Sequence, residues 1–484
     1  MRIVTWILVG CGGDDSGSTS PDGDADTDAD ADTDTDTDTD TDTDTDADTD
    51  TDTDADPPSE NVLFVLLDDL GVEELGLYAT RGTTADTPVI DGLAAEGMLF
   101  RNAWSMPLCA PTRASLLTGR YPTRTTVGMV VENDVSGVTG ANPLPDAEYT
   151  LAELLRDAPT PWDRSLTGKW HLSQYTGAKV ATNPADQGFA WHAGPIGNLD
   201  PTLDGTHGYY DWDKNDNGVI APTTDYATTD TADDAIARLG AMTEPWFLYL
   251  TFNSPHDPWQ VPPESLVPGP IDPDDVPAVF RSMITATDTE LGRVLAALPA
   301  DVRARTTIVV MGDNGTDSDV YGVPGRLKAT VYEGGVHAPL IVTGPRVGAP
   351  GSTSDALVDV VDWYPTIAEI AGVDPAAAPT AGPLDGVSLL PVLADPTATV
   401  RSSAYTESFF NDDEYTFAIR DDRYKLVVMH HWFYTVPVFD AVELYDLVDD
   451  PTESHDLAGD PTYADVLTRL TDEATALRVS MAAR

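Results

Sequence analysis

Five short apolar runs recur along the chain, and each is followed at once by polar residues with glycine or proline. They are NVLFVLLDDLG (61–71), RSLTGKWH (164–171), WFLYLTFNSPH (246–256), TTIVVMGDNG (306–315) and APLIVTGP (338–345). A strand that is buried on both faces has this near-continuous apolar character, which is typical of parallel sheets covered by helices. The runs therefore predict an α/β fold.

Segments with helical spacing lie between these runs. They are VIDGLAAEG (89–97) after Thr87-Pro88, YTLAELLRDA (149–158), TADDAIARLGAM (231–242) and ITATDTELGRVLAAL (284–298). Alternation of strands and helices predicts a mostly parallel sheet sandwiched between helices. From about residue 396 the pattern changes to strands and turns in the segments 417–429 and 442–458, followed by a closing helix at 464–483. We expect this part to be a smaller α+β subdomain with a short antiparallel sheet.

Polar side chains follow four of the predicted strands at the point where each strand ends. They are Asp68-Asp69, Lys169 with His171, His256, and Asp313-Asn314. Ligands of open α/β sheets bind outside the carboxyl ends of the strands, so these groups are expected to converge on one edge. Carboxylate and amide oxygens suit Ca²⁺ or Mg²⁺ and not zinc. Taken singly, each cluster is also an ordinary turn sequence.

The chain is strongly acidic, with 26 Lys+Arg against 82 Asp+Glu and a formal net charge of −56. Residues 14–58 hold 20 of the Asp and no basic residue, in a largely alternating Asp-Thr pattern. This charge excludes a nucleic-acid-binding surface. It argues only weakly against polyanionic substrates, because a local basic pocket can override a field that is screened within about 8 Å.

The chain begins with one arginine, a short apolar run and Leu8-Val9-Gly10-Cys11. This pattern is typical of a bacterial lipoprotein signal peptide (1–10), which leaves Cys11 as a lipidated N-terminus. Residues 11–58 then form a disordered tether, because an Asp/Thr repeat has nothing apolar to bury. A calcium-binding array is the alternative, but the glycine turns of such repeats are absent. We expect an exported protein, periplasmic or at the cell surface, that reaches the membrane only through its lipid.

If Cys11 is lipidated, Cys109 has no partner for an intramolecular disulfide. A helix is expected to begin just after Cys109 and to end at Gly119. The helix N-terminus and Arg113 would place positive potential beside the cysteine, an environment that favours anions. A buried structural thiol is the ordinary interpretation of a lone cysteine. The neighbours of Cys109 argue instead for a functional role.

Cys109-Ala110-Pro111-Thr112-Arg113 and Leu117-Thr118-Gly119-Arg120 fill every fixed position of C-x-P-x-R-x-x-x-L-T-G-R. The segment resembles the signature of the formylglycine-dependent sulfatases, a family with the alkaline-phosphatase-like fold. Further landmarks occur in the family's order: GKWHL (168–172), SPHDP (254–258), GDNG (312–315), KATVYEGG (328–335) and ELYDLVDDPTE (443–453). The resemblance covers residues 60 to about 460. The change of pattern near residue 396 divides the folded part into a catalytic domain (59–395) and a C-terminal subdomain (396–484).

The resemblance implies a role for each matched residue. A separate maturation enzyme would oxidise Cys109 to Cα-formylglycine, whose hydrate is the nucleophile that attacks sulfur. The implied Ca²⁺ ligands, with Mg²⁺ possible, are Asp68, Asp69, Cys109, Asp313 and Asn314. Arg113 and Lys169 would hold the hydrate, and His171 would accept the proton that triggers sulfate release. His256 and Lys328 would contact sulfate, and either could protonate the leaving oxygen.

These observations predict hydrolysis of sulfate monoesters of carbohydrates or aryl alcohols. A phosphonate or phosphate monoester hydrolase of the same superfamily is an alternative, because one oxyanion pocket hardly distinguishes the two groups. A non-catalytic relative that binds glycans is the third, although every matched catalytic position is filled. A separate segment, DWDKNDNGVI (211–220), resembles half of a calcium loop, but lacks the loop's final Glu and is expected to be a hairpin.

Overall fold

The computed structural model describes residues 60–80, 82–131, 141–177, 179–199, 208–322, 325–411, 414–430 and 441–482. The predicted signal peptide, the lipidated Cys11 and the tether lie outside these residues. Among the described helices, none has the length and apolar character required to cross a bilayer.

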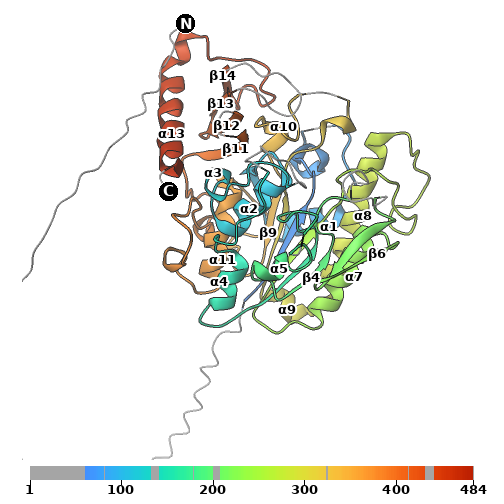
Figure 1. The fold of residues 1–484 in the computed structure, drawn as a ribbon. Coiled ribbons are helices and arrows are strands. Elements are labelled where there is room, and N and C mark those ends of the chain that lie inside the picture. Colours follow the sequence, from blue (N-terminus) through green and yellow to red (C-terminus); the bar gives the residue numbers. More distant parts are fainter. Residues whose placement is uncertain are drawn as a thin grey trace, which may run out of the picture. The chain divides into compact units, whose positions relative to one another are not determined.

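The main element is a ten-stranded sheet in the order β10-β2-β9-β8-β1-β7-β3-β4-β5-β6. Figure 1 labels β4, β6 and β9 of this sheet. Its strands are β1 (Asn61–Leu67), β2 (Met98–Trp104), β3 (Asp163–Gly168), β4 (Trp191–Gly194), β5 (Trp212–Asp216), β6 (Val219–Thr223), β7 (Trp246–Phe252), β8 (Thr306–Gly312), β9 (Leu340–Thr343) and β10 (Ser352–Asp359). The central strands β8, β1, β7, β3 and β4 pair in parallel, and β10 is parallel to β2. The predicted mostly parallel sheet is confirmed.

One of the five apolar runs, residues 338–345, contains an antiparallel strand and not a parallel one. β9 pairs antiparallel with both β2 and β8. The chain leaves β8 at the carboxyl edge of the sheet, and the described residues between β8 and β9 (313–322 and 325–339) include the short helix α10 (Glu333–Val336). It then re-enters the sheet from that same edge, so no crossover helix is needed and β9 runs the opposite way.

Helices cover both faces of the sheet, as the near-continuous apolar runs require. Along β1, Val62, Phe64 and Leu66 belong to one buried cluster, whereas Leu63, Val65 and Leu67 belong to another. The first cluster packs against α2 (Cys109–Thr118), α4 (Leu151–Asp157) and α11 (Trp363–Ile370). The second packs against α1 (Pro88–Glu96), α7 (Ala227–Leu239) and α8 (Val276–Ala297) (Figure 1). All four predicted helical segments are present.

Shorter elements connect these layers. They are α3 (Pro122–Thr125), α5 (Asn183–Asp186), α9 (Ala300–Ala304) and α12 (Leu390–Ala394). The predicted hairpin joins β5 to β6 through Asn217 and Gly218, whose φ angles of 47° and 99° are both positive. Positive φ at both central residues is what a tight two-residue turn needs.

The C-terminal part forms a second, antiparallel sheet in the order β11-β12-β13-β14. Its strands are β11 (Ala404–Asn411), β12 (Glu414–Arg420), β13 (Tyr424–His430) and β14 (Ala441–Asp446), and the helix α13 (Ala464–Ala482) packs on it. Residues of this sheet and helix, such as Leu426 and Leu470, share one buried cluster with the main sheet. The predicted α+β elements are present and join the main core.

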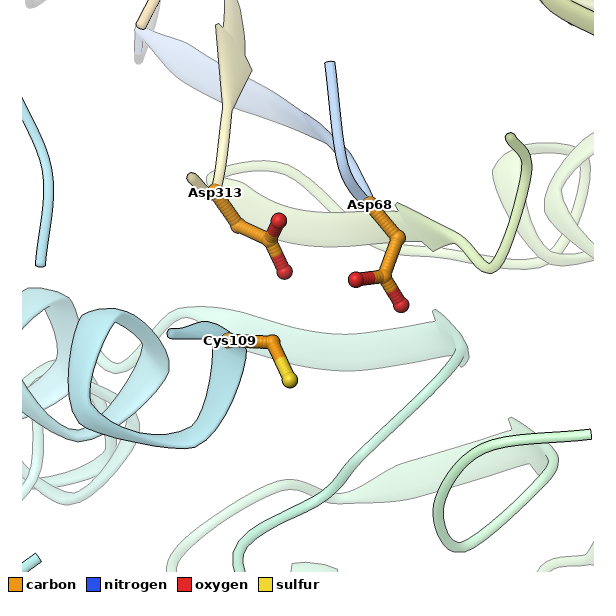
Figure 2. Close-up of side chains that lie close together, drawn as sticks. All are labelled: Asp68, Cys109 and Asp313. Carbon is orange, nitrogen blue, oxygen red and sulfur yellow. The ribbon is translucent and has the colours of Figure 1, made fainter. Parts of the chain in front are cut away.

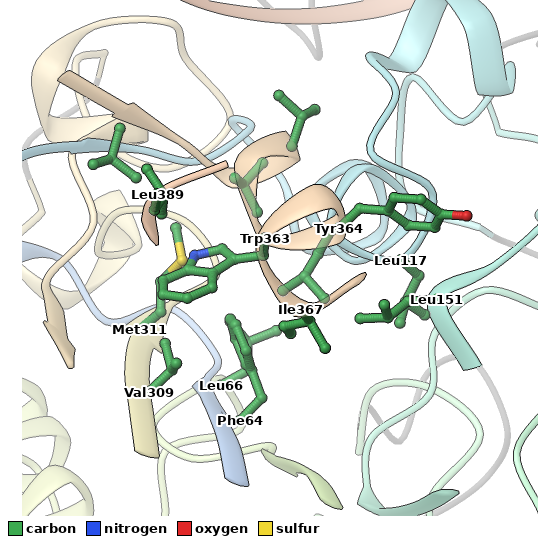
Figure 3. Packing of buried hydrophobic residues seen from close by; sticks show 14 of the residues in the cluster. Phe64, Leu66, Leu117, Leu151, Val309, Met311, Trp363, Tyr364, Ile367 and Leu389 are labelled. Atoms are coloured by element: carbon green, nitrogen blue, oxygen red, sulfur yellow. The ribbon is translucent and has the colours of Figure 1, made fainter. Parts of the chain in front are cut away.

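Trp363 and Ile367 of α11 lie at the centre of that shared core (Figure 3). The Trp363 indole packs edge-on against Phe64 of β1 with ring centroids 5.3 Å apart. Both α11 side chains are fully buried. Helix α11 therefore stabilises the face of the sheet that carries Val62, Phe64 and Leu66.

We expect Ile367→Ala to lower the free energy of unfolding by about 2–5 kcal/mol, because it leaves a cavity in the close-packed core. Ile220→Ala is the matched control, since Ile220 is 41% exposed on β6. The control should change stability by less than about 0.5 kcal/mol. Urea unfolding of both variants measures the difference, and equal losses would contradict this account of the core.

Candidate active site

The predicted site residues meet at the carboxyl edge of four adjacent parallel strands. Asp68 directly follows β1, Asp313 directly follows β8, Lys169 directly follows β3, and His256 comes four residues after β7. The order β8-β1-β7-β3 makes these strands neighbours, which the sequence alone left open. Figure 2 shows Asp68 and Asp313 pointing from their strands toward Cys109 of α2.

The glycine at the end of β3, Gly168, is required by the close approach of the neighbouring strand β7. Gly168 has a φ of +97°, and a Cβ there would lie 1.9 Å from the carbonyl oxygen of Thr251 on β7. Only glycine allows this approach of the two strands. The following residue, Lys169, donates its backbone N–H to the same carbonyl at 2.9 Å. The glycine thus fixes where the Lys169 side chain enters the site.

Cys109 is the first residue of α2, one residue earlier than the predicted start of that helix. Its Sγ is buried and lies 3.2 Å from Nδ1 of His171. The helix N-terminus gives this position positive potential. Burial nevertheless raises the pKa of the thiol to about 11. An unmodified Cys109 is therefore a neutral thiol at physiological pH and a poor nucleophile.

Two other residues of α2 attach the helix to the strand ends. The Arg113 guanidinium is fully buried, donates to Oδ2 of Asp313 at 2.9 Å and donates to the carbonyl of Lys169 at 2.8 Å. The Thr112 hydroxyl donates to the carbonyl of Asp313 at 2.6 Å. Thr112 occupies a variable position of the signature, so the motif gave no signal for it.

Three buried carboxylates, Asp68, Asp69 and Asp313, share a small number of neighbouring cations. Burial acts to raise the pKa of Asp68, but the charges of Lys169 and the other nearby cations outweigh it and hold that pKa well below its usual range. Burial raises the pKa of Asp313 to about 7, and the charge of Asp68 adds to this effect. Burial also raises the pKa of Asp69, although Lys328 opposes it. The cluster would therefore be stabilised by further positive charge.

The donor set fits a hard divalent cation. Single ligand atoms of Asp68, Cys109 and Asp313 lie within 4.8 Å of one another, and so do those of Asp68, Asp69 and His256. Within the described part of the chain, Oδ1 of Asp68 and Oδ1 of Asn314 are buried and have no hydrogen-bond partner. Buried oxygens of this kind need a partner. The arrangement could hold Ca²⁺ or Mg²⁺, which favour such ligands.

The two histidines have opposite electrostatic environments. Burial, together with the charges of Lys169 and Arg113, holds the pKa of His171 well below its usual value. Burial and Lys328 act to lower the pKa of His256, but the carboxylates Asp69 and Asp68 outweigh them and raise it. His171 is thus a neutral base beside Cys109, and His256 favours the protonated form of an acid.

The remaining contacts join the predicted residues into one network. Lys169 pairs with Asp68, Lys328 Nζ donates to Oδ2 of Asp69 at 2.7 Å, and Nδ2 of Asn314 donates to Oδ1 of Asp69 at 2.8 Å. His256 Nε2 lies 3.9 Å from Oδ2 of Asp69. Every predicted catalytic and metal-binding side chain is therefore brought together. Cys11, the predicted lipidation site, lies outside the described residues.

The structure shows an ion triad that stabilises the segment carrying Lys328, and the sequence did not predict it. Lys425 of β13 is fully buried, with Nζ 3.1 Å from Oε1 of Glu333 and 2.7 Å from Oε1 of Glu453. Oε2 of Glu453 accepts the backbone N–H of Glu333 at 2.6 Å. This ion triad fixes α10, five residues beyond Lys328, to the C-terminal sheet. Both glutamates lie in family landmarks, whereas nothing local distinguishes Lys425.

The comparisons with known proteins agree with this site. The sulfatase family model matches residues 60–373, and the model of the N-sulphoglucosamine sulphohydrolase C-terminal region matches residues 327–480. The chain is 30% identical to N-acetylgalactosamine-6-sulfatase of Canis lupus familiaris over 379 residues (72% of this chain, 69% of the relative). It is also 30% identical to arylsulfatase A of Homo sapiens over 403 residues (76% and 74%).

Solved structures share the fold. Ps i-CgsB in complex with k-i-k-neocarrahexaose matches with a TM-score of 0.71 and 24% identity, covering 87% of this chain and 92% of that one. A structure bound to its substrate D-glucosamine-2-N,6-O-disulfate matches with a TM-score of 0.69 and 21% identity, covering 87% and 98%. The architecture is the alkaline-phosphatase-like sandwich of the sulfatases, as expected.

Fold, site and sequence matches together define a sulfuric ester hydrolase. The chain belongs to the sulfatase family, whose members hydrolyse the sulfate esters of glycans and aryl alcohols.

We expect Lys425→Met to lower the free energy of unfolding by about 3–5 kcal/mol, because it leaves Glu453 buried without its cation and Glu333 with only Arg420, 3.7 Å away. Lys179→Met is the matched control, because its ion pair with Asp146 is more than half exposed and is screened by solvent, so its loss should hardly change stability. Urea unfolding measures both values. Equal effects of the two variants would contradict a supporting role for the triad.

Proposed function

We propose that the enzyme releases inorganic sulfate from carbohydrate or aryl sulfate monoesters through a Cα-formylglycine derived from Cys109. A formylglycine-generating enzyme would perform this conversion, and Asp68, Asp69, Asp313, Asn314 and the matured residue 109 would hold Ca²⁺. The observation that carries the proposal is the position of Cys109: it faces Asp68 and Asp313 at the start of α2, and its Sγ lies 3.2 Å from His171.

Two groups absent from the unmodified chain supply part of the chemistry. The hydrated aldehyde offers two hydroxyls on one carbon, one to attack sulfur and the other to expel sulfate afterwards. A bound Ca²⁺ polarises oxygen and stabilises negative charge. Burial keeps the Cys109 thiol protonated, which agrees with a need for maturation.

The chain's own residues hold charge and move protons. Arg113, Lys169 and Lys328 place three buried or nearly buried cations around residue 109, where they stabilise the charge of a sulfuryl group. His171, which is neutral, takes the proton of the residue-109 hydroxyl at its Nδ1. His256 donates a proton to the leaving oxygen, and its Nδ1 lies 2.7 Å from the carbonyl oxygen of Asp257. Lys328 is a second candidate for this donor.

The proposal includes the location of the enzyme. The apolar start of the chain and Cys11 support export as a bacterial lipoprotein, with residues 11–58 as a tether between the lipid and a catalytic domain that begins near residue 59. Mass spectrometry of the N-terminal peptide from the native host checks this. A mature chain that still starts at Met1 would refute it.

We expect Cys109→Ala to abolish turnover of 4-nitrophenyl sulfate while the thermal unfolding midpoint stays within a few degrees of the parent protein. The methyl side chain fits the same helical position but cannot be converted into an aldehyde. Mass spectrometry of the peptide that contains residue 109 should show aldehyde in active wild-type enzyme. An active wild-type enzyme with an unaltered thiol would refute the mechanism.

We expect Asp313→Ala to weaken Ca²⁺ binding and activity together, because it removes one carboxylate of the proposed site. Calorimetric titration of Ca²⁺ measures the affinity, and the rise in unfolding midpoint with Ca²⁺ is an independent readout. Asp319→Ala is a control in the same loop whose side chain is not part of the cluster. Unchanged Ca²⁺ affinity in Asp313→Ala would place the metal elsewhere.

A further inference from the structure

In the described part of the chain, most basic residues outside the active site are paired with neighbouring acids. Every Lys and Arg that the structure describes outside the site, other than Arg164, Arg281 and Arg326, forms an ion pair with an Asp or Glu. Arg164 donates to the backbone carbonyls of Trp162 and Gly188, and Arg326 lies over the ring of Tyr332 at 4.5 Å. The described surface therefore offers no basic track for an extended polyanion.

Within the site, the three cations lie close together and are buried or nearly buried. Arg113 and Lys169 are fully buried, and the Lys328 side chain is only 11% exposed. All three contact the buried carboxylates Asp68, Asp69 or Asp313. They surround the position of residue 109, so their charge serves a sulfuryl group there and not a second anion further out.

Two acids flank this group of cations. Asp257 lies beside His256, with Oδ1 2.9 Å from Nδ1, and its side chain is 40% exposed. Asp317 follows the metal-site loop, next to Thr316, whose carbonyl accepts the backbone N–H of Lys328 at 3.0 Å. Burial acts to lower the pKa of Lys328, but Asp69 and, to a smaller extent, Asp317 raise it. Burial acts to raise the pKa of Asp257, but its hydrogen bond with His256 and, to a smaller extent, Lys328 lower it.

We propose that the site selects sulfate esters whose remaining part carries no negative charge, and that Asp257 and Asp317 repel polysulfated chains. This inference rests on the proposed function and names its substrate class. A second anionic group on the leaving alcohol would meet these carboxylates in place of a cation. The acidic composition of the whole chain adds a long-range repulsion of the same sign.

The direction of the salt effect tests the proposal. Matured enzyme is assayed with 4-nitrophenyl sulfate and with the same ester carrying a sulfonate on the ring, from about 20 to 500 mM ionic strength. Salt screens repulsion, so kcat/KM for the sulfonated ester should rise by at least about threefold relative to the parent ester. Dextran sulfate should inhibit hydrolysis of 4-nitrophenyl sulfate poorly at low salt. A relative fall with salt, or strong inhibition that salt relieves, would overturn the proposal.

A variant separates the local carboxylate from the general acidity. Asp317→Asn keeps a side chain that can accept the backbone N–H of Asp319, as Asp317 does at 2.8 Å. At low salt it should raise the sulfonated-to-parent ratio of kcat/KM by about two- to threefold, because it removes one negative charge near Lys328. Asp465→Asn, at the start of α13, should leave the ratio unchanged. Equal ratios in the two variants would refute the role of Asp317.

The outcomes distinguish the two proposals. Matured protein that turns over neither ester would refute the proposed function and this inference with it. Turnover of 4-nitrophenyl sulfate together with a preference for the sulfonated ester at low salt would leave the proposed function standing and refute the selectivity alone.

Discussion

The structure depends on the burial of three carboxylates, Asp68, Asp69 and Asp313, at one edge of a sheet. Buried carboxylates are costly unless cations or hydrogen bonds compensate them. Arg113 of α2, Lys169 after β3 and Lys328 before α10 supply that compensation from three different segments. Folding therefore has to bring these segments together, and the result is a site in which positive charge surrounds Cys109.

The C-terminal subdomain takes part in this arrangement. Its sheet contributes Lys425, whose ion pairs with Glu333 and Glu453 hold the segment that carries Lys328. Its helix α13 and strands share one buried cluster with the main sheet. The subdomain is consequently part of the support of the site, and damage to it should displace Lys328 without touching the strands that carry the acids.

The distribution of charge inside the site differs from that on the rest of the described surface. Inside the site, cations are concentrated around one anionic group. Outside it, most of the described basic residues form ion pairs with Asp or Glu, and carboxylates such as Asp257 and Asp317 adjoin the site. This distribution of charge underlies the proposal that the rest of the substrate is recognised through uncharged groups.

The sequence by itself determined which strands carry site residues, because apolar runs that end in Asp68-Asp69, Lys169 or Asp313-Asn314 place polar groups at the shared carboxyl edge of a parallel sheet. The signature around Cys109 identified the family. Only the tertiary structure decided the strand order, the reversed direction of β9, and the partners of Thr112 and Lys425. Those features rest on contacts between residues far apart in the chain, and local periodicity carries no information about them.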